Sequence, residues 1–400
     1  MNEGRVNAPQ PRAGNPTLGW LSMIDPRRVG WLRLLLVFLP AAAASKFAGA
    51  PDVLTFALAA TAIIPLAGLI GESTESLAQH MGPGIGGLLN ATFGNAAELI
   101  IALFALFNGL DSVVKASLTG SIIGNLLLVM GASFLAGGIR HRVQRFNRTA
   151  AGSASTLMVL AAMGMLVPAI FDRLVPTGDT PAEHDLSLAV SVLLIITYGL
   201  SLLFSLVTHR DLYNPAQAAC DEDEPSWTTR KSVIVLVVST AFVAWMSEIL
   251  VGAVEGASHS LGLTEIFVGV IVVAIVGNAA EHSTAVMVAW KNKADLAVGI
   301  AMGSALQIAL FVAPVLVFVS HLRPHPMDLL FTPLEVAAVV LAVILARMVA
   351  EDGESNWLEG AMLLMIYAIL ATAFFYFPEP KEKPQTHQAT TISLPQPPAP

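Results

Sequence analysis

Charged side chains are scarce in this sequence. Asp, Glu, Lys and Arg make up 12% of its 400 residues, whereas soluble proteins carry about 25%. Hydrophobic residues reach 55% and the mean hydropathy is +0.69, which excludes an ordinary soluble globular protein. The single cysteine, Cys220, excludes an internal disulfide. The net charge of −8 comes from loops and tails, so it gives no indication of a nucleic-acid partner.

What the sequence does contain is long apolar runs, each able to cross a hydrocarbon core about 30 Å thick. A segment that crosses without internal water must satisfy its own backbone hydrogen bonds as a helix. The predicted fold is therefore an all-α polytopic membrane protein embedded in a lipid bilayer. Its eleven predicted transmembrane helices lie near residues 29–48, 53–76, 85–107, 113–138, 152–171, 186–208, 232–256, 264–290, 296–320, 331–349 and 357–377.

Basic residues predict the orientation of these helices. With the amino terminus placed in the cytoplasm, fifteen of the 21 Lys and Arg residues fall on the inner side and six on the outer side. The inner group includes four arginines in the segment 140–148, together with Lys291 and Lys293. Because cytoplasmic loops are enriched in Lys and Arg, we expect a cytoplasmic amino terminus.

The pentapeptide Gly-Asn-Ala-Ala-Glu occurs twice, at residues 94–98 and 277–281, each time inside a long apolar run. The offset of 183 positions is kept downstream, where the Gly-Ser pair at 120–121 corresponds to that at 303–304. The second copy lies five helices after the first, on the eighth predicted helix instead of the third, so the two copies cross the bilayer in opposite directions and form an inverted repeat. Transporters built from such repeats place their binding site near the midplane, at the interface of the repeats.

The repeat divides the chain into six predicted segments. They are a cytoplasmic amino-terminal tail (1–28), a peripheral first transmembrane helix (29–50), a first five-helix repeat (51–208), a cytoplasmic acidic linker (209–231), a second five-helix repeat (232–377) and a disordered, proline-rich carboxy-terminal tail (378–400). The amino-terminal tail lacks the short apolar core of a secretory signal. The linker carries the acidic run 221–224, and such like-charge blocks are usually solvated.

The glutamates that end the two pentapeptides, Glu98 and Glu281, are the central candidates for function. An ionised glutamate at the bilayer centre costs several kcal/mol and usually faces a water-filled cavity or a counter-charge, yet neither helix carries a Lys or Arg at that depth. If the two glutamates meet, mutual repulsion and burial both favour protonation, and the pair titrates as one unit. Protons or one divalent cation would neutralise the site, so the two compete for the same oxygens. The alternative is a protonated glutamate that is hydrogen-bonded inside the bundle.

The residues around the two glutamates predict a hard divalent cation. Asn95 and Asn278 each precede a glutamate by three positions, so each pair should share a helix face. Gly94 and Gly277 would allow close backbone approach or free a carbonyl for coordination. Further oxygens come from the fourth and ninth predicted helices, through Ser121, Asn125, Ser304 and Gln307. Such oxygen ligands suit Ca²⁺, although a lone intramembrane Asn or Ser more often links two helices by a hydrogen bond.

A second group of acids lies on the second and seventh predicted helices. One polar stripe consists of Glu72, Glu75 and Gln79, and the other of Glu248, Glu255 and His259. We expect both stripes to line aqueous routes to the site; the alternative is that some of the acids lie at the membrane surface. His282 points about 100° away from Glu281 around the helix, so the sequence leaves open whether it packs in the bundle or relays protons.

These motifs resemble those of a known family. Gly-Asn-Ala-Ala-Glu-Leu-Ile at 94–100 and Gly-Asn-Ala-Ala-Glu-His at 277–282, with Gly-Ser-Ile-Ile-Gly-Asn at 120–125 and Gly-Ser-Ala-Leu-Gln at 303–307, are similar to the two α-repeats of the cation/proton exchanger (CAX) family. This family belongs to the calcium/cation antiporter superfamily. The resemblance covers the second to the eleventh predicted helices and the acidic linker.

The resemblance implies an eleven-helix antiporter that exchanges Ca²⁺ for H⁺. It also implies that Glu98 and Glu281 bind the cation and carry the protons, and that acids near the access routes include Glu75, Glu248 and Glu255. Alternating access would expose the paired glutamates to each side of the membrane in turn. The membrane is expected to be a prokaryotic plasma membrane, with a vacuolar membrane as the alternative.

Other functions remain open at this stage. Sodium/calcium exchangers of the same superfamily typically carry an acid in the fourth and ninth helices, where this chain has Asn125 and Gln307, which leaves fewer carboxylates for Na⁺. A cation channel is a second alternative, since acid-lined pores also select cations. A membrane enzyme is a third, although the sequence has no His-Glu-x-x-His zinc motif. We expect no enzyme activity and no cofactor, while transport of Mn²⁺ and the oligomeric state stay open.

Overall fold

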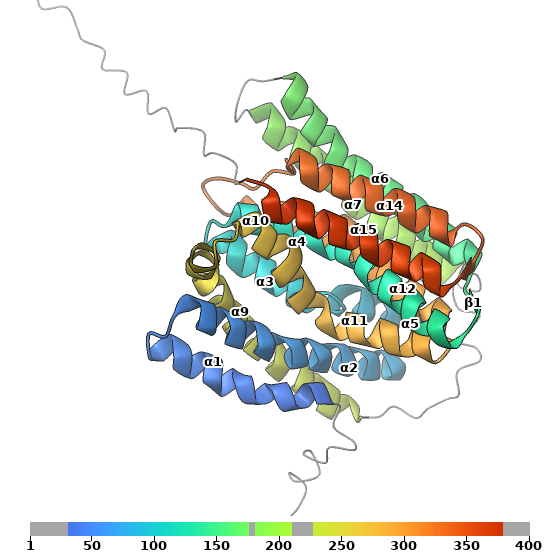
Figure 1. Cartoon of the computed structure of the whole chain (residues 1–400), viewed down its shortest axis with the longest axis horizontal. Coiled ribbons are helices and arrows are strands. Elements are labelled where there is room, and N and C mark those ends of the chain that lie inside the picture. Colours follow the sequence, from blue (N-terminus) through green and yellow to red (C-terminus); the bar gives the residue numbers. More distant parts are fainter. Residues whose placement is uncertain (1–30, 176–180, 210–226, 379–400) are drawn as a thin grey trace, which may run out of the picture.

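The computed structural model describes residues 31–175, 181–209 and 227–378, which form a bundle of helices (Figure 1). The predicted tails and most of the acidic linker lie outside the described residues. In chain order the elements are η3 (Trp31–Val37), α1 (Phe38–Phe47), α2 (Asp52–Phe93), α3 (Ala96–Phe107), α4 (Asp111–Ile123), η4 (Gly124–Val129), α5 (Met130–Arg140), β1 (Gln144–Arg145), α6 (Arg148–Leu174), α7 (Pro181–Leu203), η5 (Phe204–Thr208), α9 (Thr229–Leu261), α10 (Glu265–Phe267), η6 (Val268–Val273), α11 (Ala274–Trp290), α12 (Ala294–Gln307), η7 (Ile308–Val312), α13 (Ala313–Ser320), α14 (Pro333–Ala350), β2 (Glu354–Ser355) and α15 (Trp357–Tyr376).

The described helices confirm the predicted all-α polytopic class. Among the described residues, nine helical segments are long and apolar enough to cross a membrane. α3 is apolar but has only 12 residues, and η3 with α1 occupies the first predicted helix. The exact number of crossings, predicted as eleven, stays a prediction.

The two ends of the bundle carry different polar connections. One end carries the short antiparallel pair of β1 and β2, in which Gln144 pairs with Ser355 and Arg145 with Glu354, and it lies at the right of Figure 1. We call it the inner end, because its basic loops are predicted to face the cytoplasm. The opposite, outer end carries the connection between α13 and α14, residues 321–332.

α2 doubles back on itself near the inner end. A Cβ placed on Gly86 would lie 2.6 Å from the carbonyl oxygen of Ala78, although eight residues of straight helix span about 12 Å. The chain therefore reverses direction between these residues, where the sequence reads Gly-Pro-Gly at 82–84. Glycine and proline both interrupt regular helices. The predicted helices 53–76 and 85–107 are thus antiparallel, as expected, but no regular loop separates them.

The two identical pentapeptides adopt different backbones. In the first repeat, α2 ends at Phe93, residues 94–95 form a turn, and α3 begins at Ala96. In the second repeat, α11 runs through residues 277–281 without a break. The expected continuous helix, with Asn and Glu on one face, is therefore present only in α11. Because the five residues are the same, the difference must come from their surroundings, which include both the flanking sequence and the packing.

Small residues allow the helices to cross closely. α2 and α9 make the most extensive contact in the bundle. α5 and α15 cross where a Cβ on Gly360 would lie 2.6 Å from the carbonyl oxygen of Gly131. Close packing of this kind stabilises helix pairs in a bilayer, where lipid tails are as apolar as the side chains and burial contributes little.

Candidate cation site

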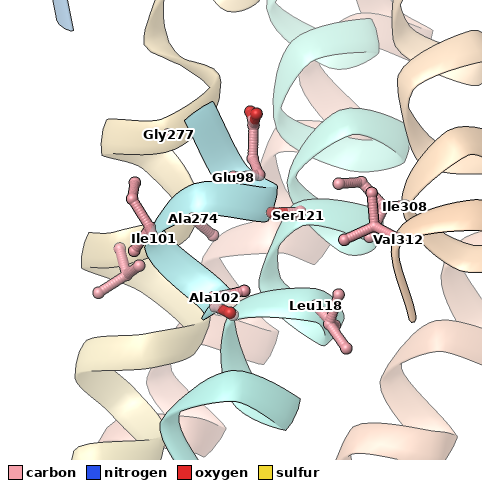
Figure 2. A pocket seen from close by; sticks show the side chains of 11 residues that line it. Glu98, Ile101, Ala102, Leu118, Ser121, Ala274, Gly277, Ile308 and Val312 are labelled. Atoms are coloured by element: carbon pink, nitrogen blue, oxygen red, sulfur yellow. The ribbon is translucent and has the colours of Figure 1, made fainter. Parts of the chain in front are cut away.

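Glu98 and Glu281 approach the same region from the two repeats. Glu98 lies in the first turn of α3, where free backbone N–H groups favour a negative charge. A Cβ placed on Gly277 of α11 would lie 3.1 Å from Cγ of Glu98, so the Glu98 side chain packs against the bare backbone of α11. Glu281 follows Gly277 by four positions, which is one turn along the same helix face. Figure 2 shows Glu98 projecting from α3 close to Gly277 and Ser121.

Six polar side chains predicted from the sequence form one hydrogen-bonded cluster, which we call the amide cluster. Its members are Asn95, Ser121, Asn125, Asn278, Ser304 and Gln307. On the side of the first pentapeptide, Asn95 Nδ2 donates to Gln307 Oε1, and Ser304 Oγ donates to Asn95 Oδ1 at 2.8 Å. The cluster therefore links α12 to the turn that precedes α3.

The other half of the amide cluster links α4, η4 and α11. Asn125 Nδ2 donates to Ser304 Oγ at 2.9 Å and to Asn278 Oδ1 at 3.2 Å. Asn278 Nδ2 donates to Ser121 Oγ at 3.0 Å and to the carbonyl oxygen of Ala274 at 2.9 Å. All of these groups are buried except Gln307, which is half-buried. The amide groups of both pentapeptides thus hold the two repeats together.

Within the described part of the chain, three buried oxygens at this site have no hydrogen-bond partner: Glu98 Oε2, Glu281 Oε2 and Asn125 Oδ1. A buried oxygen without a partner costs about 1–3 kcal/mol, and more if it carries charge. The oxygens of Asn95, Asn278 and Gln307 already accept hydrogen bonds within the amide cluster. In this state the free acceptors are therefore two carboxylates and one amide, a donor set suited to a hard cation or to protons.

The two pentapeptide glycines serve different purposes. Gly94 lies where the helix opens into a turn, and a Cβ there would lie 2.7 Å from the carbonyl oxygen of Asn90 and 3.2 Å from Gln307 Oε1. Gly277 stays helical and gives room to the Glu98 side chain. Both predicted possibilities, a loosened helix and a close approach, therefore occur, one in each repeat.

A small cavity of about 10 Å³ adjoins Glu98. Ser121 and Gly277 line it, together with apolar side chains of α3, α4, η6, α11 and η7 (Figure 2). This volume is near the minimum for one water molecule. The cavity therefore has room for about one water molecule between Glu98 and the apolar side chains of Leu118 and Val273.

The predicted access-route acids are spread along the bundle. Glu75 and Glu248 are exposed in the isolated chain. Glu72 forms an ion pair with Arg33 of η3, which ties it to the peripheral first helix. Glu255 lies in a groove of about 770 Å³ at the outer end of α9.

His259 and Glu265 line the same outer groove as Glu255. His282 is half-buried next to Glu281, and its Nε2 atom has no hydrogen-bond partner. Among the described residues, no group of three or more His, Cys, Asp or Glu side chains is arranged to hold a metal ion. A cation here would therefore depend on the two glutamates supplemented by amide, hydroxyl or backbone oxygens.

Sequence reasoning missed the π-helical turns beside the site. η4 spans Gly124–Val129 and η7 spans Ile308–Val312, and the offset of 183 places them at matching positions of the two repeats. Such turns often mark functional sites, because the wider turn shifts side chains and carbonyls out of the regular helical register. Apolar π-turn sequences do not differ from helical ones, so no pattern in the sequence could have shown them.

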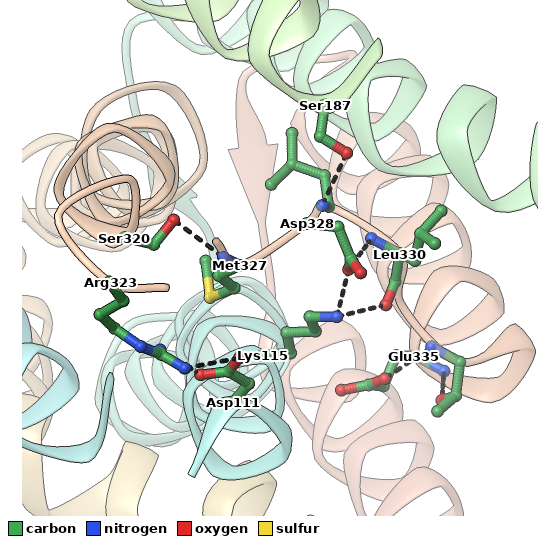
Figure 3. A network of polar contacts seen from close by, with 11 residues as sticks. Asp111, Lys115, Ser187, Ser320, Arg323, Met327, Asp328, Leu330 and Glu335 are labelled. Carbon is green, nitrogen blue, oxygen red and sulfur yellow. Dashed lines mark hydrogen bonds and ion pairs between the residues drawn. The ribbon is translucent and has the colours of Figure 1, made fainter. Parts of the chain in front are cut away.

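A polar network at the outer end was also missed (Figure 3). Arg323 makes two hydrogen bonds to the carboxylate of Asp111, at 2.6 and 3.3 Å. Lys115 pairs with Asp328 and donates to the carbonyl oxygen of Leu330 at 3.0 Å. The connection 321–332 is thereby fixed to the outer half of α4.

Comparison with known proteins places this chain in a family. The model of the sodium/calcium exchanger protein family matches residues 52–207 and 231–376, which cover both repeats. The chain belongs to this family. It is 48% identical over 360 residues to a protein named Ca²⁺/H⁺ antiporter from Synechocystis sp. (strain ATCC 27184 / PCC 6803 / Kazusa), with 86% of this chain and 97% of that protein covered. It is 49% identical over 328 residues to the Ca²⁺/H⁺ antiporter ChaA of Bacillus subtilis (strain 168), with 81% and 93% covered.

A solved structure agrees with this placement. The structure of native YfkE superposes with a TM-score of 0.76 at 42% identity, covering 86% of this chain and all of that one. The resemblance to cation/proton exchangers that the motifs suggested is therefore confirmed at the level of the whole chain.

Proposed function

We propose that this protein is a secondary active antiporter that exchanges Ca²⁺ for H⁺ by alternating access at the Glu98/Glu281 site. The observation that carries the proposal is the pair of glutamates supplied by inverted repeats, each with a buried oxygen that lacks a partner. The names of the Synechocystis and Bacillus relatives, both Ca²⁺/H⁺ antiporters, support the same pair of ions.

Electrostatics explains why such a site exchanges ions instead of leaking them. Two unneutralised carboxylates close together in a buried place repel one another and lose hydration. One Ca²⁺ or two protons removes that cost, so the loaded forms are the ones that reorganise readily. The empty, doubly charged form is disfavoured, which couples the outward movement of one ion to the inward movement of the other.

Sodium is the less favoured counter-ion. Asn125 and Gln307 are amides that take part in the amide cluster, so that cluster adds no carboxylate to the two glutamates. Several Na⁺ ions would need more negative charge than this pair provides. The proposal therefore names Ca²⁺ and H⁺. The basic inner loops support a cytoplasmic amino terminus, and the bacterial relatives support a plasma membrane.

The deciding experiment is Ca²⁺ uptake into proteoliposomes under an imposed pH gradient. Wild-type protein should take up Ca²⁺, and Glu98→Gln or Glu281→Gln should each lower uptake by at least about tenfold, because either change removes a charge worth more than about 1.4 kcal/mol of site affinity. Glu351→Gln, at an exposed acid beyond α14, is the matched control and should transport normally. If uptake survives both site changes, the assignment of Glu98 and Glu281 as the site is wrong. If uptake is driven only by a Na⁺ gradient, the assignment of H⁺ as the counter-ion is wrong.

A further inference from the structure

The inverted repeats are packed differently at their two ends. At the outer end, α4 and η6 touch backbone to backbone. A Cβ on Gly120 would overlap the carbonyl oxygen of Val270, and a Cβ on Gly269 would lie 2.6 Å from Cβ of Ala116. Ala116 is fully buried. This contact lies on the outer side of Ser121, next to the small cavity beside Glu98.

The offset of 183 gives each of these four residues a counterpart near the inner end. Gly299 corresponds to Ala116 and Gly303 to Gly120, both on α12, while Gly86 corresponds to Gly269 and Gly87 to Val270. All four counterparts are glycines. The present packing gives no reason to exclude a side chain at Gly299 or Gly303, because nothing among the described residues lies within 4 Å of a Cβ placed there.

These glycines do not touch one another in this structure. Nothing lies within 4 Å of a Cβ placed on Gly299 or Gly303, and Gly299 is exposed. Gly86 instead rests on Ala78, and a Cβ on Gly87 would lie 2.5 Å from Cδ2 of Leu206. The inner end therefore has the small residues for a close helix crossing, but α12 and the last part of α2 do not make this crossing here.

We propose that Gly86, Gly87, Gly299 and Gly303 form the inner closure of the transport cycle. When the site opens outward, the segment 85–90 leaves Ala78 and packs on α12, with Gly86 against Gly299 and Gly303 against the backbone of Gly87. This crossing reproduces the present contact between η6 and α4, because exchange of the two repeat conformations converts one access state into the other. The inference rests on the proposed alternating access, and it adds the residues that close the inner side.

The first test is a side chain that fits one state only. Nothing lies within 4 Å of a Cβ placed on Gly303, so we expect Gly303→Leu to be accommodated here, whereas it would collide with the backbone of Gly87 in the closed crossing. We expect this variant to fold and to bind Ca²⁺ in detergent with wild-type affinity, while its exchange rate falls at least about tenfold. Gly152→Leu is the control, since Gly152 is an exposed helical glycine near the same end with nothing within 4 Å. Exchange by Gly303→Leu at more than half the control rate would overturn the closure.

A second test does not depend on which ions are carried. In a Cys220→Ser background, the pair Gly86→Cys and Gly299→Cys should form a disulfide under mild oxidation. At the matching outer positions, a Cβ on Gly269 would lie 2.6 Å from Cβ of Ala116, so the two backbones come close enough for a disulfide, whose Cβ atoms lie about 3.8 Å apart. Gly86→Cys with Gly152→Cys should not cross-link. If the first pair never cross-links, the closure is wrong even when Ca²⁺/H⁺ exchange is observed. If it cross-links while the wild type shows no proton-driven Ca²⁺ uptake, the proposed function fails and the closure stands.

Discussion

Glu98 shows how one side chain depends on the residue that faces it. Its carboxylate rests against Gly277, where any larger residue would occupy the space of the glutamate stem. The sequence marked both residues as important because they belong to the repeated pentapeptide. It could not show that the glycine of one copy accommodates the glutamate of the other, since that contact joins residues 179 positions apart.

The smallest change at this contact should weaken the site without unfolding the protein. In Gly277→Ala the new Cβ would lie 3.1 Å from Cγ of Glu98, so the glutamate must shift by a few tenths of an ångström. We expect Ca²⁺ affinity to fall by about threefold to tenfold, equal to about 0.7–1.4 kcal/mol, with the melting temperature nearly unchanged. Calorimetric titration in detergent measures this. Gly152→Ala is the control, and equal affinities for the two variants would contradict the contact.

Polar residues of the site were predictable as a set but not as individual partners. The offset between the repeats grouped four residues as candidates for one site: Asn95, Asn278, Ser121 and Ser304. The amide cluster contains all four. Which oxygen stays free depends on the direction of each hydrogen bond. That direction is set by three-dimensional packing, so Asn125 Oδ1 could not be singled out from the sequence.

Helical elements were predicted well where hydrophobicity alone decides them. Apolar runs fixed the positions of the long helices because the bilayer demands a minimum apolar length. The sequence predicted that a helix could loosen at Gly94 or Gly277 but not which copy would break, and it did not predict that α2 would reverse direction without a regular loop. Nor did it predict that the connection 321–332 would be fixed by ion pairs, since those partners lie on distant helices.

The connection 321–332 gives a prediction about how its contact with α4 contributes to stability. Lys115 and Asp328 are largely shielded from solvent, with side-chain exposures of 17% and 24%, and Lys115 also donates to the carbonyl oxygen of Leu330. Lys115→Met leaves a partly buried carboxylate and a carbonyl without this donor, which should cost about 1–3 kcal/mol of unfolding free energy. Thermal unfolding of the purified protein in detergent measures the loss.

A double-mutant cycle separates this ion pair from general packing. Combining Lys115→Met with Asp328→Asn should restore part of the loss, because the two side chains interact directly. The exposed pair of Arg145 and Glu354, at 3.0 Å with exposures of 81% and 45%, is the matched control. Its disruption should change stability by no more than about 0.5–1 kcal/mol. Equal losses at both pairs would contradict a special role for the outer network.

At the scale of the whole molecule, the outer half contains a close helix crossing that its counterpart in the inner half lacks. Gly120 and Gly269 bring α4 and η6 together, while Gly299 and Gly303 face open space. Two repeats with related sequences thus adopt different packings in one chain. This asymmetry was not predictable, because the repeated motifs are almost the same and only one of two equivalent states is present.

The charge of the site leads to a prediction about the complete exchange cycle. The amide cluster contains no acid, so in the proposed mechanism Glu98 and Glu281 carry the negative charge that the ions neutralise. One Ca²⁺ neutralises both, and so do two protons, which makes the exchange of one Ca²⁺ for two H⁺ electrically neutral. A membrane potential does work on moving charge of about 2.3 kcal/mol per elementary charge at 100 mV. For a neutral exchange that work is zero.

We therefore expect the final Ca²⁺ gradient in proteoliposomes to follow the pH gradient alone. Clamping the potential near 0 or near 100 mV in either direction with a K⁺ gradient and an ionophore should leave this gradient unchanged. With one extra proton per cycle, the same potential would shift the gradient about fiftyfold, because 2.3 kcal/mol corresponds to that ratio at room temperature. A shift of this size would mean that a third titrating group takes part, and the half-buried His282 beside Glu281 would be the first residue to replace.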